Sequence, residues 1–215
     1  MKLFLFGGAE TDQGQASTLK KQINTVLAEI KPKQLLHIPY ARVEVPKGEE
    51  DVWGEGWVKR DLNLNGIELL DARAKEDLDK ADSPTIFING GPQRDNIYEK
   101  IISNSQLHHL TEKAEYIIGE SSGSMVCAEF RITQKNNKGM TVKGLGILKD
   151  TIIEPHYSER NRQEALREEM KESKVKYGIG IDSITAVVID TGSYPDNLKK
   201  IGEGIVDYVR IKDFL

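Results

Sequence analysis

The 215-residue sequence has a single cysteine, Cys127, so no disulfide can form within the chain. Scarcity of cysteine is typical of proteins kept in a reducing compartment, and we expect a cytoplasmic protein. Cys127 lies six residues after Ser121, in an apolar stretch. We therefore interpret it as a core residue and not as a functional thiol.

Long apolar runs are also absent, because none approaches the ~18 residues that a membrane-spanning helix requires. The apolar opening, residues 1–6, reaches Gly7-Gly8 too soon for the core of a secretory signal, and we interpret it as a strand. Neither sign of charge dominates, since 30 basic and 34 acidic residues give a net charge of −4. The basic residues are dispersed among acidic ones, so we expect neither nucleic acid nor a membrane as a partner.

Short β-prone segments alternate with helix-compatible ones in the first 120 residues, and most of these strands end at glycine or proline. We expect strands over 3–6, 34–38, 66–70, 85–88 and 116–118, with helices over 17–30 and 49–62. This alternation predicts an α/β fold with a mostly parallel central sheet flanked by helices on both faces. Sites in such sheets form at the carboxyl ends of the strands, which here carry Gly7-Gly8, Pro39-Tyr40, Gly90-Gly91 and Ser121.

The pattern changes after Val142, where short strands over 142–148, 151–153, 177–181, 186–189 and 204–211 surround one helix over 160–172. No repeat and no linker rich in Pro, Gly or Ser interrupts the chain. The length fits one substantial domain, so we predict a single domain over residues 1–215.

The most informative feature is the pentapeptide Gly119-Glu120-Ser121-Ser122-Gly123. It directly follows the strand-like residues 116–118 and precedes a helix-compatible stretch over 125–130. G-x-S-x-G between a strand and a helix is typical of a nucleophile elbow, a sharp turn that exposes the central serine. The pattern predicts Ser121 as the nucleophile and the Ser122 N–H as an oxyanion donor at the helix start. The alternative is a small-residue turn with no catalytic role.

A nucleophilic serine needs a base, and His156 is the only histidine after the elbow. It follows a strand-like segment, and Pro155 stiffens the chain before it. The alternative is a surface-loop histidine. Since His156 comes only 35 residues after Ser121, the spacing disfavours an ordinary α/β-hydrolase. The adjacent His108 and His109 lack the spacing of metal ligands, and we expect no metal and no cofactor.

Together these motifs resemble those of the peptidase E and cyanophycinase family of serine peptidases, whose fold is related to the class I glutamine amidotransferases. The elbow is similar to the family's G-x-S-A-G, with Ser122 where alanine is usual. Residues 155–157 resemble its P-H-F segment, and residues 156–162 resemble its H-F-x-x-R-x-R run. Further similarities, spread over nearly the whole chain, are Leu5-Phe6-Gly7-Gly8, Ile38-Pro39-Tyr40-Ala41, Gly90-Gly91 with Gln93, and residues 180–186.

The resemblance implies a role for each site residue. Ser121 would attack a peptide carbonyl, and His156 would take its proton and return it to the leaving amine. The N–H groups of Ser122 and Gly91 would bind the oxyanion. Arg162 matches a family arginine that binds an acidic substrate side chain, a task that suits a guanidinium fork, and Arg160 belongs to the same run.

Two positions depart from the family pattern. Ser183 stands where the family has the glutamate that orients the histidine. We predict that Asp182, one residue away, takes over this task, with Glu154 as the second candidate and Ser183 itself as a neutral acceptor. Pro92 stands where a glycine or an aspartate is usual, and proline has no N–H to donate. The oxyanion donor in this loop is therefore assigned to the N–H of Gly91.

We thus predict a serine peptidase that hydrolyses short peptides, as an exopeptidase or dipeptidase favouring an acidic residue, aspartate, at the scissile bond. The alternative is a catalytically weakened or inactive relative that binds a small acidic ligand. A glutamine amidotransferase is disfavoured because a serine, not a cysteine, occupies the elbow. This prediction covers both α- and β-aspartyl linkages, and a homodimer as well as a monomer.

Overall fold

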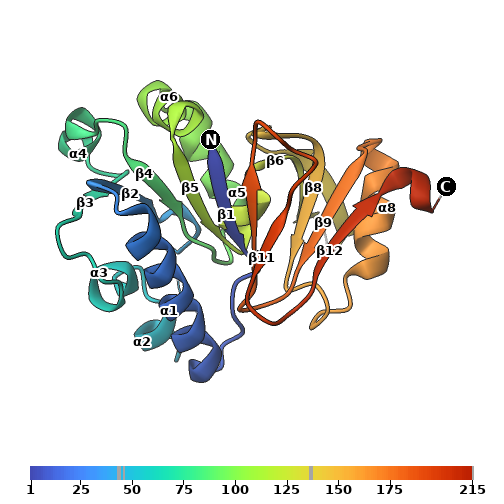
Figure 1. The fold of residues 1–215 in the computed structure, drawn as a ribbon, viewed down its shortest axis with the longest axis horizontal. Helices are drawn as coiled ribbons and strands as arrows, with labels where there is room; N and C mark the ends of the chain where they lie inside the picture. The colour runs from blue at the N-terminus through green and yellow to red at the C-terminus, as the bar shows by residue number, and fades with distance from the viewer. Residues whose placement is uncertain (43–44, 46, 136–137, 215) are drawn as a thin grey trace.

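A computed structural model describes residues 1–42, 45, 47–135 and 138–214, and within them two sheets lie side by side (Figure 1). The larger sheet has seven described strands in the order β11-β10-β1-β5-β4-β2-β3. Its parallel part consists of β1 (Lys2–Phe6), β5 (Tyr116–Glu120), β4 (Thr85–Ile88), β2 (Gln34–Ile38) and β3 (Glu68–Asp71). Two antiparallel strands, β10 (Ala186–Asp190) and β11 (Lys199–Ile201), extend the sheet beyond β1.

Helices cover both faces of the larger sheet, which confirms the predicted fold class. The side chains of β1 alternate between two cores. Phe4 and Phe6 face the core formed with α1 (Gln13–Ile30), α2 (Glu50–Trp53) and α3 (Trp57–Asp61). Leu3 and Leu5 face the core formed with α4 (Lys75–Lys80), α5 (Arg94–Ser103) and α6 (Ser105–Lys113).

Local signals set the ends of the long helix α1. The Asp12 carboxylate accepts hydrogen bonds from the backbone N–H groups of Gly14 and Gln15, at 2.6 and 3.1 Å, and so caps the first turn. The helix ends at Lys31, which adopts a left-handed conformation with φ of 48° directly before Pro32. The loop between β1 and α1 is thereby held at the carboxyl edge of the sheet, beside the elbow.

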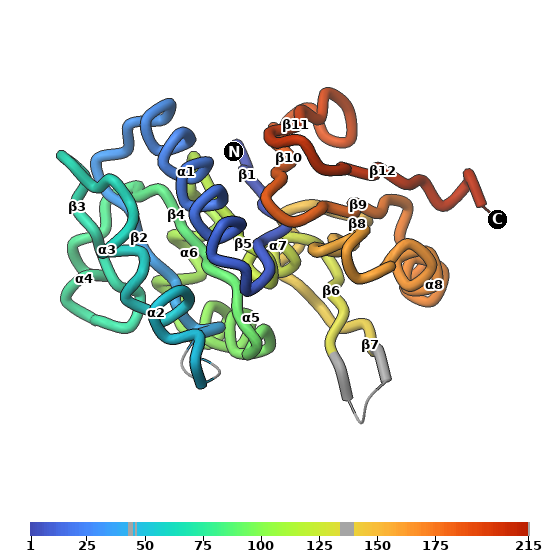
Figure 2. Tube along the Cα trace, turned by 90° about the horizontal axis from the view of Figure 1, so that it is seen from below, coloured from blue at the N-terminus to red at the C-terminus, as the bar shows by residue number. Residues whose placement is uncertain are grey.

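The smaller sheet has five described strands in the order β12-β9-β8-β6-β7. Their bounds are Val206–Arg210 for β12, Tyr177–Ile181 for β9, Leu148–Pro155 for β8, Ala128–Lys135 for β6 and Lys138–Lys143 for β7. The helix α8 (Gln163–Ser173) packs on one face, where its Leu166 and Met170 contact Ile152 and Tyr157. Figure 2 shows α8 on the side of this sheet that faces away from the larger one. Two short 3₁₀ turns, η1 (Tyr40–Arg42) and η2 (Ile211–Asp213), complete the described elements.

The second sheet is the main difference from the sequence prediction. The helix expected over 125–130 is wrong, because α7 covers only Ser122–Met125 and β6 begins at Ala128. The apolar pattern of this stretch suits either a helix or a strand. It forms a strand because it pairs with β8, where Ala128 lies opposite Leu148. The expected strand over 142–148 is likewise divided between β7 and β8, and β11 was not predicted. Cys127 is a core residue as expected, and burial raises the pKa of its thiol to about 12.

Candidate active site

Ser121 sits at a strained turn between β5 and α7. Its φ of 50° and ψ of −113° lie outside the regions that a residue with a side chain prefers, as a nucleophile elbow requires. Its backbone N–H donates to the Phe6 carbonyl at 2.9 Å, which ties the elbow to the neighbouring strand β1. Gly123 allows the turn, because a Cβ there would lie 2.0 Å from the Ile88 carbonyl oxygen.

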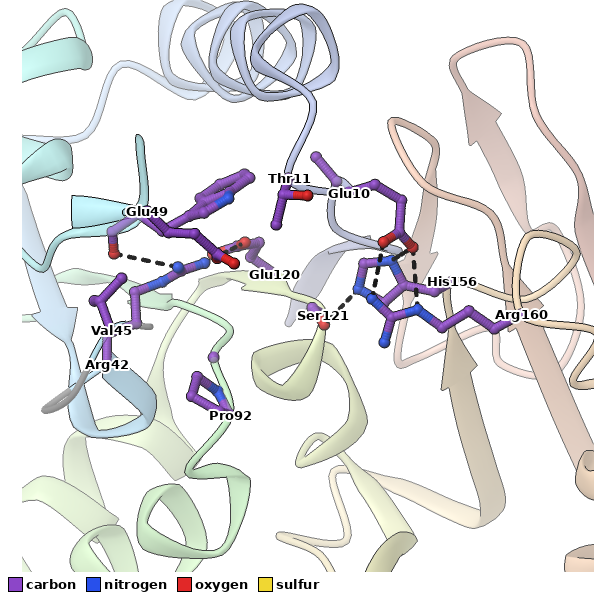
Figure 3. A pocket seen from close by; sticks show the side chains of 13 residues that line it. Glu10, Thr11, Arg42, Val45, Glu49, Pro92, Glu120, Ser121, His156 and Arg160 are labelled. Carbon is purple, nitrogen blue, oxygen red and sulfur yellow. Dashed lines mark hydrogen bonds and ion pairs between the residues drawn. The ribbon is translucent and has the colours of Figure 1, made fainter. Parts of the chain in front are cut away.

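His156 lies beside this serine, as the sequence analysis expected. It directly follows β8, and its Nε2 is 3.0 Å from Ser121 Oγ (Figure 3). Gly8 makes this approach possible, because a Cβ there would lie 2.9 Å from the imidazole ring and from Ser121 Cβ. The Gly7 carbonyl also accepts the His156 backbone N–H at 3.3 Å. The two side chains therefore meet across the end of β1.

The imidazole is uncharged at neutral pH. Burial, followed by the nearby Arg160 guanidinium, lowers the pKa of His156 to about 4, although Glu10 acts in the opposite direction. A neutral ring has one N–H and one lone pair. With Nδ1 protonated, the Nε2 lone pair faces the Ser121 hydroxyl, which is the arrangement that general-base catalysis needs.

Two groups lie within hydrogen-bond distance of His156 Nδ1. The Ser183 hydroxyl oxygen is 2.9 Å away, and the Glu10 Oε1 atom is 3.1 Å away. Ser183 thus lies where the neutral-acceptor alternative placed it. Glu10, in the loop between β1 and α1, was not predicted. Glu10 comes two residues after Gly8, at a strand end that the sequence analysis had assigned to the site. Its closeness in sequence to this strand end could have identified it as a site residue.

Asp182 does not contact the imidazole, so its prediction as the orienting acid is wrong. Its Oδ1 accepts the Ser158 N–H at 2.9 Å and its Oδ2 accepts the Ile205 N–H at 2.8 Å. Both oxygens therefore serve to join loops of the smaller sheet. Glu154, the second candidate, forms a buried ion pair with Arg162 instead.

The two residues predicted to supply oxyanion donors, Ser122 and Gly91, contact each other beside the nucleophile. Ser122 is the first residue of α7, where a backbone N–H has no partner in its own helix. The Gly91 N–H is already engaged, because it donates to the Ser122 hydroxyl at 3.0 Å, and this hydroxyl also lies 3.1 Å from the Gly91 carbonyl. An oxyanion that used the Gly91 N–H would have to displace the Ser122 hydroxyl from it.

A buried ion pair joins the elbow to the glycine loop. The Glu120 carboxylate accepts from Arg42 Nη2 at 2.7 Å and from the Gly90 N–H at 2.9 Å. The Arg42 guanidinium also lies 4.8 Å from the centre of the Trp53 ring, and both charged side chains are at most 7% exposed. Separating the two charges would leave each of them buried and unpaired, which is strongly destabilising. The pair therefore holds the glycine loop against the elbow.

The sequence profile of peptidase family S51 matches residues 3–195. The chain belongs to this family. The cyanophycinase of Synechococcus elongatus is 28% identical over 171 residues, which are 72% of this chain and 52% of that protein. The cyanophycinase of Geminocystis herdmanii is 25% identical over 185 residues, 75% of this chain and 65% of that protein. The chain thus spans about half to two thirds of the length of these S51 relatives.

Solved structures support the fold of this S51 chain. A peptidase from an acI-B1 Actinobacterium superposes with a TM-score of 0.61 at 21% identity, covering 98% of this chain and 91% of that one. A putative peptidase E protein from Listeria monocytogenes EGD-e gives 0.60 at 15% identity, covering 94% and 98%. At these identities the likeness establishes the shared architecture.

Two pockets flank Ser121 in the S51 chain, and they differ in charge. The first, of 320 Å³, contains Glu10, Glu49 and the buried Arg42–Glu120 pair. The second, of 260 Å³, contains Arg94 and Arg162. Arg160, like Ser121 and His156, borders both pockets.

The three arginines differ in how far they are engaged. Arg160 donates from Nε and Nη2 to both carboxylate oxygens of Glu10, at 3.0 and 3.1 Å. Arg162 is paired with the buried Glu154. Arg94 is half-buried, and its guanidinium makes no hydrogen bond to the residues that the structure describes. Burial lowers the pKa of this guanidinium. Arg94 was not predicted, because nothing in its sequence neighbourhood separates it from a solvated helix-start residue.

Two absences hold for the described residues only. No group of three or more His, Cys, Asp or Glu side chains among them could hold a metal ion. None of the helices that they form is long and apolar enough to cross a membrane.

Proposed function

We propose that this chain is a serine peptidase that hydrolyses short peptides through an acyl-enzyme. One observation carries the proposal: Ser121, held at a strained strand-to-helix turn, has its Oγ 3.0 Å from Nε2 of a neutral His156. A serine with an ordinary structural role does not need this turn, which holds the backbone in a disfavoured conformation. Membership of a peptidase family supports the same reaction class.

The reaction follows from the positions of these atoms. As Ser121 Oγ attacks the peptide carbonyl carbon, its proton passes to His156 Nε2. The carbonyl oxygen becomes an oxyanion near the start of α7, where the Ser122 N–H and the positive end of the helix stabilise it. His156 then donates its proton to the leaving amine, and a water molecule hydrolyses the ester by the same steps.

The dimensions and charges of the pockets favour a small acidic substrate. Pockets of 320 and 260 Å³ lie just above and just below the lower limit of the range for small-molecule sites, and they suit a dipeptide better than a long chain. Arg94 and Arg162 supply guanidinium groups beside Ser121, and these match a carboxylate in charge and shape. We therefore propose a dipeptidase or exopeptidase that prefers an aspartate at the scissile bond.

Covalent labelling tests the reaction class directly. A fluorophosphonate probe reacts only with an activated hydroxyl, so we expect it to label the protein, with the adduct mapped to Ser121 by mass spectrometry. Ser121→Ala should remove both the labelling and the hydrolysis of dipeptides, with a loss in kcat of about 10⁶-fold, while circular dichroism stays unchanged. An unlabelled protein that binds acidic dipeptides without cleaving them would instead be a binding relative of the family.

A dipeptide series tests the preference. Substrates with Asp, Asn, Glu or Ala as the first residue, and with α- or β-linked aspartate, differ in the charge and position of one carboxylate. We expect kcat/KM to be highest for an aspartyl substrate. Equal rates for Asp and Asn would remove the proposed preference and leave the peptidase proposal intact.

A further inference from the structure

The family position for the acid that orients the histidine is occupied by Ser183, and neither predicted substitute reaches the ring. A serine–histidine pair needs an acceptor at the second ring nitrogen to fix its tautomer and to balance the charge that the ring acquires. The ring of His156 does have a carboxylate beside it, from a different part of the chain. We propose that Glu10, in the loop after β1, is the carboxylate that positions His156. This inference rests on the proposed peptidase function.

The geometry of Glu10 fits this role. Its Oε1 lies 3.1 Å from His156 Nδ1, on the side of the ring opposite Ser121, and Figure 3 shows the carboxylate joined to both the imidazole and Arg160. The guanidinium binds both carboxylate oxygens, which fixes the orientation of the carboxylate. The Glu10 N–H donates to Gln15 Oε1 at 3.0 Å, so the first helix turn also holds the loop.

The charge of Glu10 fits as well. Its hydrogen bonds to Arg160 hold the pKa of the carboxyl below its ordinary value, so it is ionised near neutral pH. When the Ser121 proton reaches Nε2, the ring becomes a cation. The Glu10 carboxylate beside Nδ1 carries the negative charge that stabilises this cation. Arg160 moderates this charge, and Arg162 adds a second positive group that acts on the ring.

Ser183 has a complementary task. Its hydroxyl, 2.9 Å from Nδ1 and almost fully buried, can accept the same N–H and so hold the plane of the ring. Its own backbone N–H donates to Glu159 Oε1 at 2.8 Å, which fixes the loop that carries it. A hydroxyl is neutral and cannot balance an imidazolium, so the division of labour is orientation by Ser183 and charge by Glu10.

The same geometry changes the role of Arg160. Arg160 donates to both carboxylate oxygens of Glu10, so it orients the residue that positions His156. Its guanidinium is therefore not free to bind a substrate carboxylate. The arginines left for substrate binding are those of the second pocket, Arg94 and Arg162.

Glu10→Gln tests the inference, because it keeps the shape of the side chain and removes its charge. With the best dipeptide substrate we expect kcat to fall about 100-fold, while KM changes by less than about threefold. Glu112→Gln, which removes an exposed carboxylate 3.7 Å from the imidazole of His108 on α6, away from the site, is the matched control and should keep kcat within about twofold. A purely structural role of Glu10 would lower the folded fraction and not the kcat of the folded enzyme.

Rescue separates charge from structure. In Glu10→Ala, added formate can occupy the space left by a side chain that is 35% exposed, and we expect saturable recovery of kcat by at least about tenfold, with no recovery from formamide or chloride.

Glu10→Gln with Ser183→Glu moves the carboxylate to the family position and should recover activity similarly. Wild-type kcat in Glu10→Gln, or absence of formate rescue in a folded Glu10→Ala, would overturn the inference while labelling of Ser121 still upheld the peptidase. An unlabelled wild-type protein would overturn both.

Discussion

The two sides of the site come from two sheets and are held in different ways. The nucleophile side belongs to the larger sheet, where backbone geometry fixes Ser121 and Ser122 at the junction of β5 and α7. The base side belongs to the smaller sheet, where His156 follows β8 and depends on side chains from other loops, Glu10 and Ser183. A strained turn is encoded by a few adjacent residues, whereas a supported histidine requires segments that are far apart in the sequence to meet.

Gly8 lies where the two sides touch, and its substitution is expected to have the largest effect among the residues that take no part in the chemistry themselves. In Gly8→Ala the new Cβ would lie 2.9 Å from the His156 ring and from Ser121 Cβ, so the two catalytic side chains must separate. A displacement of about 1 Å in an active site can lower the rate about 100-fold, and we expect at least that loss in kcat. Dipeptide hydrolysis at saturating substrate measures it.

Gly48→Ala is the matched control for Gly8→Ala. Both glycines have a positive φ, 95° at Gly8 and 92° at Gly48, but a Cβ at Gly48 would meet nothing within 4 Å. Both variants should therefore lose about 1 kcal/mol of stability from backbone strain, and only Gly8→Ala should lose activity. Full activity in a folded Gly8→Ala would show that catalysis does not require the close approach of Ser121 and His156 at Gly8.

How much of each side could be predicted follows from this contrast. The elbow was found from five adjacent residues, and the parallel strands that lead to it were predicted almost to their bounds, as at 34–38 and 85–88. Both of these strands are mostly apolar and buried on both faces, which gives a strong local signal. Strands were also predicted where β8, β9 and β12 lie, at 151–153, 177–181 and 204–211, but their assembly into a separate sheet was not. The strand β6 was missed because only its pairing with β8 decides between helix and strand for this apolar stretch.

The supports of His156 show the same limit. The histidine itself was found because it is the only one after the elbow. Asp182 was chosen because it is adjacent to Ser183, but its carboxylate is fully used by two backbone N–H groups. Glu10 precedes His156 by 146 residues and reaches it only because β1 ends beside β8. Contacts of this kind depend on how the sheets are docked, which no local pattern records.

The arginine pocket next to the site gives the next prediction. If Arg94 binds a substrate carboxylate, Arg94→Ala should raise KM for an aspartyl dipeptide, because the carboxylate loses a charged partner. A loss of about 2 kcal/mol, or about 30-fold in kcat/KM, is reasonable for a partly buried pair. The neutral asparaginyl or alanyl dipeptide should change little. An equal effect on both substrates would assign Arg94 a structural role instead.

Arg162→Ala requires a different control, because it leaves Glu154 buried without its partner, and burial already raises the pKa of that carboxyl. The single variant would mix substrate binding with instability. Arg162→Ala combined with Glu154→Gln, compared with Glu154→Gln alone, isolates the arginine. We expect this comparison to show an effect of the same sign as Arg94→Ala, and smaller, since the amide oxygen of a glutamine in place of Glu154 can still accept from the guanidinium and compete with the substrate carboxylate. No difference between the two would remove Arg162 from the proposed substrate pocket.

Ser122→Ala is expected to have the smallest effect and the opposite sign. The Ser122 hydroxyl accepts the Gly91 N–H at 3.0 Å, and Pro92 cannot donate in its place. If Gly91 serves the oxyanion, each turnover must break this hydrogen bond, which is worth about 1 kcal/mol. Removing the hydroxyl frees the N–H beforehand, so we expect kcat to rise about fivefold while the Ser122 N–H remains in place. A fall in kcat would mean that the hydroxyl is needed to hold the glycine loop, and an unchanged kcat would indicate that Gly91 does not contact the oxyanion and that the Ser122 N–H is the donor that matters.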